Sequence, residues 1–189
     1  FSQETEATLG LYGLKPGQTD GFGWQCLAAR RLVERGVRFV ELIHTGSSGN
    51  WDSHGTMADH GRLAPQVDQP IAGLLADLKQ RGMFDDVLVV WTSEFGRTPF
   101  NNTADAPVRE HHNWAFSSWL AGAGVKRGYV HGSTDAQGMA PAQLPVTPDD
   151  ISATIFQNLG IDPKMEIQTG SGRPITLFRE GTVIDSIVS

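Results

Sequence analysis

The sequence has a single cysteine, Cys26, among its 189 residues, so no disulfide forms within the chain. No apolar stretch approaches the length of about 20 residues that a membrane-spanning helix needs. The 15 basic residues are outnumbered by 21 acidic ones, for a net charge of -6. This balance argues against nucleic acid or an anionic membrane as a partner, because both attract a basic surface. No repeat or low-complexity linker interrupts residues 1–189, which favours a single domain.

The chain begins at Phe1 rather than at a methionine, and its first residues, FSQETEATLGLYGLKPGQTD, are typical of the interior of a longer protein. We therefore expect a fragment, from which a leader and some catalytic residues of the whole protein are missing. The compartment stays open, and export to the periplasm or the extracellular space is one option. A single cysteine does not decide this question, because exported proteins need not carry disulfides. The residue pattern carries no information on the oligomeric state.

Hydrophobic periodicity and capping residues predict alternating helices and strands. Helices are expected over residues 4–13, 22–35, 56–81 and 147–160, strands over 37–44, 85–96 and 114–125, and a shorter strand over 127–134. Pro65 and Pro70 are expected to break or delay the third helix. The apolar run from Val87 to Trp91 suits a strand covered on both faces, as in parallel sheets. This alternation predicts an α/β fold with layers of helices and sheet.

Metal-type ligands follow or precede three of these predicted strands. In open α/β sheets, reactive residues collect at the carboxyl ends of the strands. The candidates are Asp52 and His54 after the first strand, Glu94 after the second, and His111 and His112 before the third. Carboxylates and imidazoles suit a divalent ion such as zinc or manganese, and calcium less well. The alternative is that each group caps a helix or binds a turn amide, but the three places together favour a metal site.

Other polar residues near these segments have both a functional and a structural interpretation. Arg97 either holds a bound oxyanion through its two-pronged guanidinium or neutralises the neighbouring carboxylate. His44 lies within the predicted strand and is better explained as a hydrogen-bonded core histidine. Asp59 and His60 belong to the start of the following helix, where solvation or capping explains them, and His131 stays ambiguous.

Three motifs in the sequence together carry a resemblance to a known family. NWDSHG, TSEFGRTP and REHHNWAFSSWLAGAGVKRGYVHGSTD resemble the C-terminal part of the family named domain of unknown function 1501. That family is grouped with sulfatases in the alkaline-phosphatase-like superfamily. The similarity runs nearly end to end, from CLAARRLVERGVRFVEL to DISATIFQNLG. It implies a three-layer α/β/α sandwich with a mostly parallel sheet, and one or two metal ions beside a Ser, Thr or formylglycine nucleophile.

The resemblance also implies roles for individual residues. Asp52 and His54 match the first part of the superfamily's metal site, although relatives commonly space that pair wider. Glu94 falls where the Asp of an Asp-His pair stands, and His111 or His112 matches a later ligand. The expected metal site therefore consists of Asp52, His54, Glu94 and one of the two neighbouring histidines.

The chain also departs from the superfamily pattern. Phe95 stands where many relatives have the His of the Asp-His pair, which argues against a full second metal site. The nucleophile and its companion Asp belong to the N-terminal half in this superfamily and have no counterpart here.

The resemblance implies a metal-dependent hydrolase that acts on a small anionic ester of phosphate or sulfate. Glu94 would then contact the metal or a neighbouring ion, and Arg97 would bind a non-bridging oxygen of the ester. The alternative is an inactive binding or scaffold module that keeps the fold. A third interpretation is a domain whose histidines only satisfy loop backbone.

Overall fold

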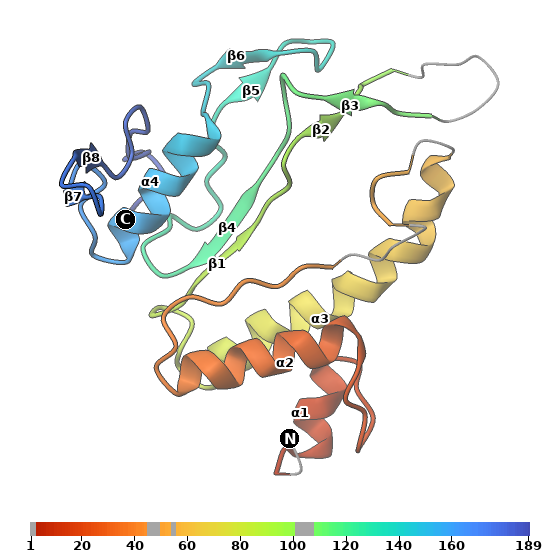
Figure 1. Ribbon diagram of the computed structural model, residues 1–189. Helices are drawn as coiled ribbons and strands as arrows, with labels where there is room; N and C mark the ends of the chain where they lie inside the picture. The colour runs from red at the N-terminus through yellow and green to blue at the C-terminus, as the bar shows by residue number, and fades with distance from the viewer. Residues whose placement is uncertain (1–2, 45–49, 54–55, 101–107) are drawn as a thin grey trace. The chain divides into compact units, whose positions relative to one another are not determined.

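The computed structural model describes residues 3–44, 50–53, 56–100 and 108–189. The chain forms two compact units, which are described separately below. Unit 1 comprises Phe1–Phe84 and Phe100–Glu110, and unit 2 comprises Asp85–Pro99 and His111–Ser189. Figure 1 labels three helices of unit 1 as α1, α2 and α3, and the strands and α4 belong to unit 2. The expectation of a single domain over the whole chain stays a prediction.

The regular structure described in unit 1 is helical. Its elements are α1 (Glu6–Leu11), α2 (Gly21–Glu34), the short 3-10 helix η1 (Met57–Asp59) and α3 (His60–Gln80). α1 begins where the hydroxyl of Thr5 accepts a hydrogen bond of 3.1 Å from the amide of Thr8. The three helices predicted in this part of the sequence are therefore confirmed, with differences of a few residues at their ends.

The prediction that two prolines break the third helix is wrong. Pro65 and Pro70 both lie inside α3, which runs through them without a gap. Each proline removes a helical N–H and costs about 3 kcal/mol in an isolated helix. Leu63 and Leu78 are buried on the packed side of α3. Tertiary packing of this apolar side supplies most of the stability of a protein helix, so it outweighs the local cost of the prolines.

A small apolar core joins the helices of unit 1. Its central members are Leu9, Tyr12, Leu14, Cys26 and Leu27. The end of α1 also approaches α3 very closely at Gly73, where an added Cβ would overlap the carbonyl oxygen of Leu11. Cys26 is buried, as the sequence predicted.

An ion-pair network that the sequence did not predict is buried among the same helices. The Nε of Arg30 in α2 donates to Asp77 Oδ2 in α3 at 2.8 Å, and the Tyr12 hydroxyl donates to the same oxygen at 2.8 Å. The Nε of Arg81 donates to the other oxygen, Oδ1, at 2.7 Å. Arg30 and Asp77 are each only 2% exposed. Asp77 therefore links the end of α1, the middle of α2 and the end of α3.

Unit 2 contains a long antiparallel ribbon. β1 (Leu88–Trp91) pairs with β4 (Trp119–Gly122), and β2 (Gly96–Arg97) pairs with β3 (His111–His112). Residues 92–95 join β1 to β2, whereas 113–118 join β3 to β4, so the second connection is two residues longer. The two pairs are thus successive stretches of one ribbon with an irregular middle, as Figure 1 shows. We call residues 88–97 and 111–122 the bulged ribbon.

Two further antiparallel pairs complete the strands described in unit 2. β5 (Ser133–Thr134) pairs with β6 (Pro141–Gln143), and β7 (Glu166–Gln168) pairs with β8 (Pro174–Thr176). The predicted strand within residues 127–134 is therefore confirmed only at its end, in β5.

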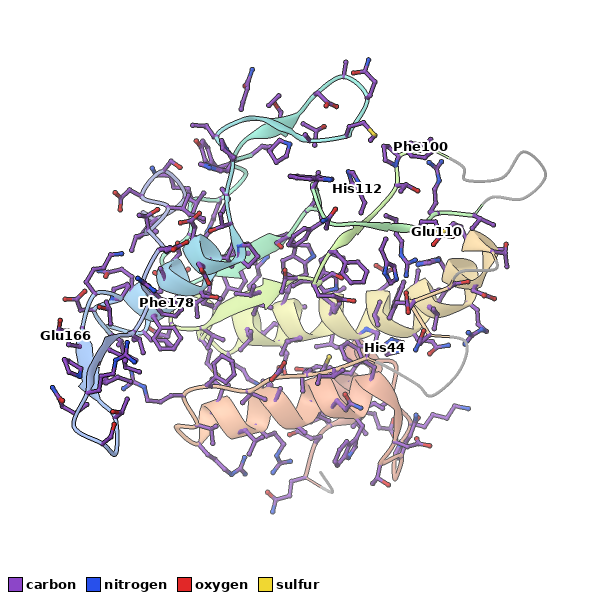
Figure 2. The ribbon with its side chains drawn as sticks, turned by 45° about the horizontal axis from the view of Figure 1, so that its top comes forward. His44, Phe100, Glu110, His112, Glu166 and Phe178 are labelled. Carbon is purple, nitrogen blue, oxygen red and sulfur yellow. The ribbon has the colours of Figure 1, made fainter. Side chains whose placement is uncertain are left out.

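Helix α4 (Pro148–Asn158) has the N-terminus that the sequence predicted. The Thr147 hydroxyl accepts a hydrogen bond from the Asp150 amide at 3.2 Å, and the Thr147 amide donates to Asp150 Oδ2 at 2.8 Å. The last part of the chain packs on this helix. The Ile184 amide donates to Thr154 Oγ1 at 3.0 Å, and Phe178, labelled in Figure 2, lies edge-on to an aromatic ring of α4.

The predicted three-layer sandwich with a mostly parallel sheet is wrong. Every sheet in the described part of the chain is a two-stranded antiparallel pair. The apolar run Val87–Trp91 does contain β1, but its partner β4 is antiparallel, and Trp91 is 44% exposed rather than covered. Residues 37–44, predicted as a strand, belong to none, and Phe39 is 66% exposed. An apolar run indicates burial but not the direction of the partner strand, which is why the prediction failed.

Among the helices of residues 3–44, 50–53, 56–100 and 108–189, none combines the length and the apolar character that a crossing of the bilayer requires.

Candidate functional site

The bulged ribbon carries four of the predicted site residues. The Thr92 hydroxyl and the Ser118 hydroxyl lie 2.7 Å apart across its irregular middle. This contact joins the two connections of unequal length, so the ribbon stays paired where its regular ladder is interrupted. Bulged stretches of this kind are common beside active sites, because they turn side chains away from the regular alternation.

Glu94 lies in a bend between β1 and β2 and is exposed. The Ser93 hydroxyl donates a hydrogen bond of 3.0 Å to its Oε2. A single neutral donor leaves the other lone pairs of the carboxylate available, since an ionised carboxylate can accept about four hydrogen bonds. The position of Glu94 just beyond β1 agrees with the sequence prediction, and its role as a ligand stays a prediction.

Arg97 and His111 lie opposite each other across the β2–β3 pair. Residues directly opposite in an antiparallel pair project from the same face of the ribbon. The ring of Phe95 packs against that of His111, with ring centroids 4.1 Å apart. This face of the ribbon thus combines a guanidinium, an imidazole and an aromatic ring that restricts the imidazole.

His112 projects from the opposite face of the ribbon, because neighbouring residues in a strand alternate. It is buried, and its Nε2 lies 2.9 Å from the carbonyl oxygen of Met139. A carbonyl oxygen only accepts, so Nε2 carries the proton and donates, and Nδ1 keeps its lone pair when the ring is neutral. Figure 2 labels His112 on its strand. Its partner across the ribbon is Gly96, where an added Cβ would overlap the carbonyl oxygen of Ala115.

The remaining predicted ligands belong to unit 1. Asp52 is exposed, and its amide donates to Asn50 Oδ1 at 3.0 Å. His54 lies outside the described residues. The neighbouring Ser53 hydroxyl donates to Asp59 Oδ2 at 3.0 Å. The Asp59 carboxylate therefore links the preceding loop to the start of the helix.

The described side chains do not form a complete metal site. Within residues 3–44, 50–53, 56–100 and 108–189, no group of three or more His, Cys, Asp or Glu comes together in a way that could hold a metal ion. The donors on the bulged ribbon are chemically suited to zinc or manganese. A shared site that also includes Asp52 and His54 stays a prediction.

His44 is hydrogen-bonded, as interpreted from the sequence, but it lies in no strand and is only partly buried rather than in the core. Its Nδ1 accepts a hydrogen bond of 2.9 Å from the Trp51 indole N–H, and its Nε2 lies 3.2 Å from Gln66 Oε1. Because Nδ1 accepts, Nε2 carries the proton and donates to the amide oxygen. Both nitrogens are therefore used in hydrogen bonds that hold the end of the 37–44 segment, and Figure 2 labels the residue there.

The structure also reveals a polar cluster that sequence reasoning missed. The buried arginine and aspartate that link α2 and α3 lie 47 residues apart in the sequence. A local signal existed, since Arg30 pairs with Glu34 and Asp77 pairs with Arg81, each at the i,i+4 spacing. That spacing is common on exposed helix faces, so it does not indicate burial.

Comparison with known families decides the relationship that the motifs suggested. The model of a family described as protein of unknown function (DUF1501) matches residues 1–188. The chain belongs to the DUF1501 family. No curated protein and no solved structure matches it. Membership in DUF1501 thus covers nearly every residue but brings no established activity with it.

Proposed function

We propose that this DUF1501 chain is part of a metal-dependent hydrolase of phosphate or sulfate esters. The observation that carries the proposal is the pairing of Arg97 with His111 on one face of the bulged ribbon. An arginine recognises the oxygens of an anionic ester in a two-pronged way, and an imidazole beside it is a metal ligand or a proton carrier. The residue types needed to bind such an ester therefore occur at adjacent positions.

Each residue of the bulged ribbon has a defined task in this proposal. Arg97 binds a non-bridging oxygen of the ester as negative charge is redistributed in the transition state. His111 and Glu94 supply imidazole nitrogen and carboxylate oxygen to a divalent ion, with Asp52 and His54 as the further predicted ligands. Such an ion, when bound, would polarise a phosphoryl or sulfuryl oxygen. The ring of Phe95 packs against His111 and restricts the orientations that the imidazole can take.

The two neighbouring histidines are assigned different tasks. A single ion cannot bind both of them while β3 keeps its alternation, because they project from opposite faces. His112 is buried and donates to a backbone carbonyl, which supports a structural role. His111 is exposed and shares its face with Arg97, so we assign the ligand role to it.

Metal content and activity of the purified full-length protein test the proposal together, because the expected nucleophile has no counterpart in the 189 residues. We expect zinc or manganese in elemental analysis, and at least about a tenfold loss of metal affinity in His111→Ala and Asp52→Ala. His131→Gln is the matched control, because it removes a histidine of unit 2 outside the proposed set. Hydrolysis of p-nitrophenyl phosphate or p-nitrophenyl sulfate should need the metal and should be lost in Arg97→Gln. Protein that binds no divalent metal would refute the hydrolase proposal.

An inactive binding or scaffold module is the second candidate function. The observation that favours it is Phe95, which stands where many superfamily relatives have a histidine and packs on a predicted ligand instead. This candidate predicts binding of metal or anionic ester without turnover. If the metal is present and neither aryl ester is hydrolysed, the scaffold interpretation replaces the hydrolase.

A further inference from the structure

Unit 1 contains a pocket that the proposed hydrolase does not use. Its volume is about 380 Å³. The charged residues that line it are Arg30, Arg31, Arg35, Arg81, Glu4 and Glu34. Four guanidinium groups around one small cavity point to an anionic occupant, because arginine is the preferred side chain for holding carboxylate and phosphate oxygens.

Glu4 already occupies part of this pocket as a bound oxyanion would. Its Oε1 lies 2.8 Å from Arg30 Nη2 and 3.0 Å from Arg31 Nη1, and its Oε2 lies 3.6 Å from Arg81 Nη2. The Glu4 side chain is 9% exposed. Three guanidinium groups from α2 and the end of α3 thus converge on one carboxylate, which shows that their arrangement suits a small oxygen anion.

The carboxylates do not use all of the donors in the pocket. The buried Nη2 of Arg30 forms an ion pair with Glu4 but has no hydrogen bond of suitable geometry among the described residues. Arg35 donates from Nη1 to the carbonyl oxygen of Arg31 at 2.9 Å, and no carboxylate of the described chain lies within ion-pair distance of it. Arg35 is therefore a cation at this pocket that no described carboxylate neutralises.

Among the charged residues that the structure describes around the pocket, the arginines outnumber the carboxylates. Glu34 bridges Arg30 at 2.8 Å and Arg81 at 3.2 Å, and Asp77 lies behind them. The four arginines thus face three carboxylates. A negatively charged ligand would balance the surplus, whereas a cation would be repelled.

We propose that this pocket binds a small phosphate-type oxyanion beside Glu4, either free or as part of a small phosphorylated molecule. Arg35 and Arg31 contact the anion, and Arg81 contributes charge from the end of α3. Guanidinium groups distinguish such an anion from chloride, because two N–H donors match two oxygens. The site lies wholly in unit 1 and is independent of the bulged ribbon.

Inorganic phosphate is the probe for the direct test. The melting temperature of the purified protein is measured during a phosphate titration, with sodium chloride adjusted to keep the ionic strength constant. Phosphate that binds the folded state should raise the melting temperature in a saturable way. Arg35→Gln should weaken phosphate at least about tenfold, since a hydrogen bond to a charged group is lost. Arg179→Gln, which removes an exposed arginine of unit 2, should leave phosphate affinity unchanged.

Two further variants exclude a merely structural explanation. Arg35→Lys keeps the charge but loses the fork of donors, so we expect it to fold and to bind phosphate more weakly than the wild type. Glu4→Gln removes the carboxylate that competes for the same arginines, so it should lower stability and yet bind phosphate more tightly. A structural role alone predicts the loss of stability without the gain in affinity.

Three results would overturn the proposal. The first is an equal rise in melting temperature with phosphate and with chloride, which would indicate an adventitious ion only. The second is the same phosphate affinity in Arg35→Gln and Arg179→Gln. The third is weaker phosphate binding in Glu4→Gln, which would mean that this carboxylate holds the pocket open rather than competing for it.

Discussion

At the scale of single residues, the proposed role of the bulged ribbon depends on the alternation of side chains along β3. His111 and His112 are chemically identical neighbours, but one is exposed beside Arg97 and the other is buried against the carbonyl oxygen of Met139. The sequence predicted that one of the two is a ligand without deciding which. Only the register of the β2–β3 pair determines which histidine shares a face with the arginine.

Asp77 is the residue whose substitution should affect stability most clearly. Asp77→Asn removes the charge that compensates buried Arg30, so we expect a loss of about 3–5 kcal/mol in the free energy of unfolding, measured by urea denaturation. Burial and the hydrogen bond to Asp77 also raise the pKa of Tyr12 above its usual range, so that hydroxyl stays a donor at neutral pH.

The matched control for this substitution is an exposed ion pair. Asp85 pairs with Arg127 at 2.6 Å, but its side chain is 80% exposed. Asp85→Asn should therefore change the free energy of unfolding by less than about 1 kcal/mol. Similar losses in the two variants would contradict a special role for the buried network.

At the scale of elements, local signals placed the helices and β1, whereas the continuity of α3 and the partner of β1 depend on tertiary contacts. α4 begins at the threonine that the sequence indicated, because capping joins groups only three residues apart. α3 begins after a 3-10 turn and continues through two prolines, against the prediction, because its packed face holds it. β1 was placed correctly by its apolar run, but its partner β4 lies about 30 residues away, beyond any local pattern.

The N-terminus of α4 should make stability depend on acid pH. Burial tends to raise the pKa of Asp150, but hydrogen bonds from Thr147 and Thr182 lower it to about 2, against an ordinary value of 3.8. A lowered pKa means that the ionised form stabilises the fold above about pH 4, and that this contribution is lost as the pH falls towards 2. The free-energy difference between wild type and Asp150→Asn should therefore shrink over that interval.

Asp149→Asn is the control for this pH dependence. Asp149 is its exposed neighbour in the first turn of α4. We expect the pH profile of unfolding in this variant to stay close to that of the wild type. If Asp150→Asn follows the same profile as Asp149→Asn, the hydrogen bonds at the N-cap do not control the acid response.

At the scale of the whole molecule, the chain divides its polar chemistry between two units. Unit 1 buries an ion-pair network beside an open, arginine-lined pocket, whereas unit 2 presents the bulged ribbon. One cysteine excludes a disulfide within the chain, and the net acidic charge argues against a nucleic-acid partner. Each unit must therefore be stabilised by packing, hydrogen bonds and ion pairs.

Cys26 provides a measurement of how often unit 1 opens. Burial raises the pKa of its thiol to about 12. At pH 8 the folded protein should therefore react with a thiol reagent far more slowly than the urea-unfolded chain, because the thiolate is the nucleophile. Asp77→Asn should speed up the labelling by opening the same core. Rapid labelling of the folded wild type would contradict the burial of Cys26.

The sequence by itself determined the helices, the cap of α4, the buried cysteine and the motifs of the DUF1501 family. These features depend on residue type and on spacings of a few positions, which are visible along the chain. Tertiary structure decided the antiparallel partner of β1, the continuity of α3 and the burial of Arg30 with Asp77. Each of these features joins residues far apart in the sequence or depends on packing around a helix. The contacts that stabilise it therefore form only when the chain folds, and no local pattern predicts them.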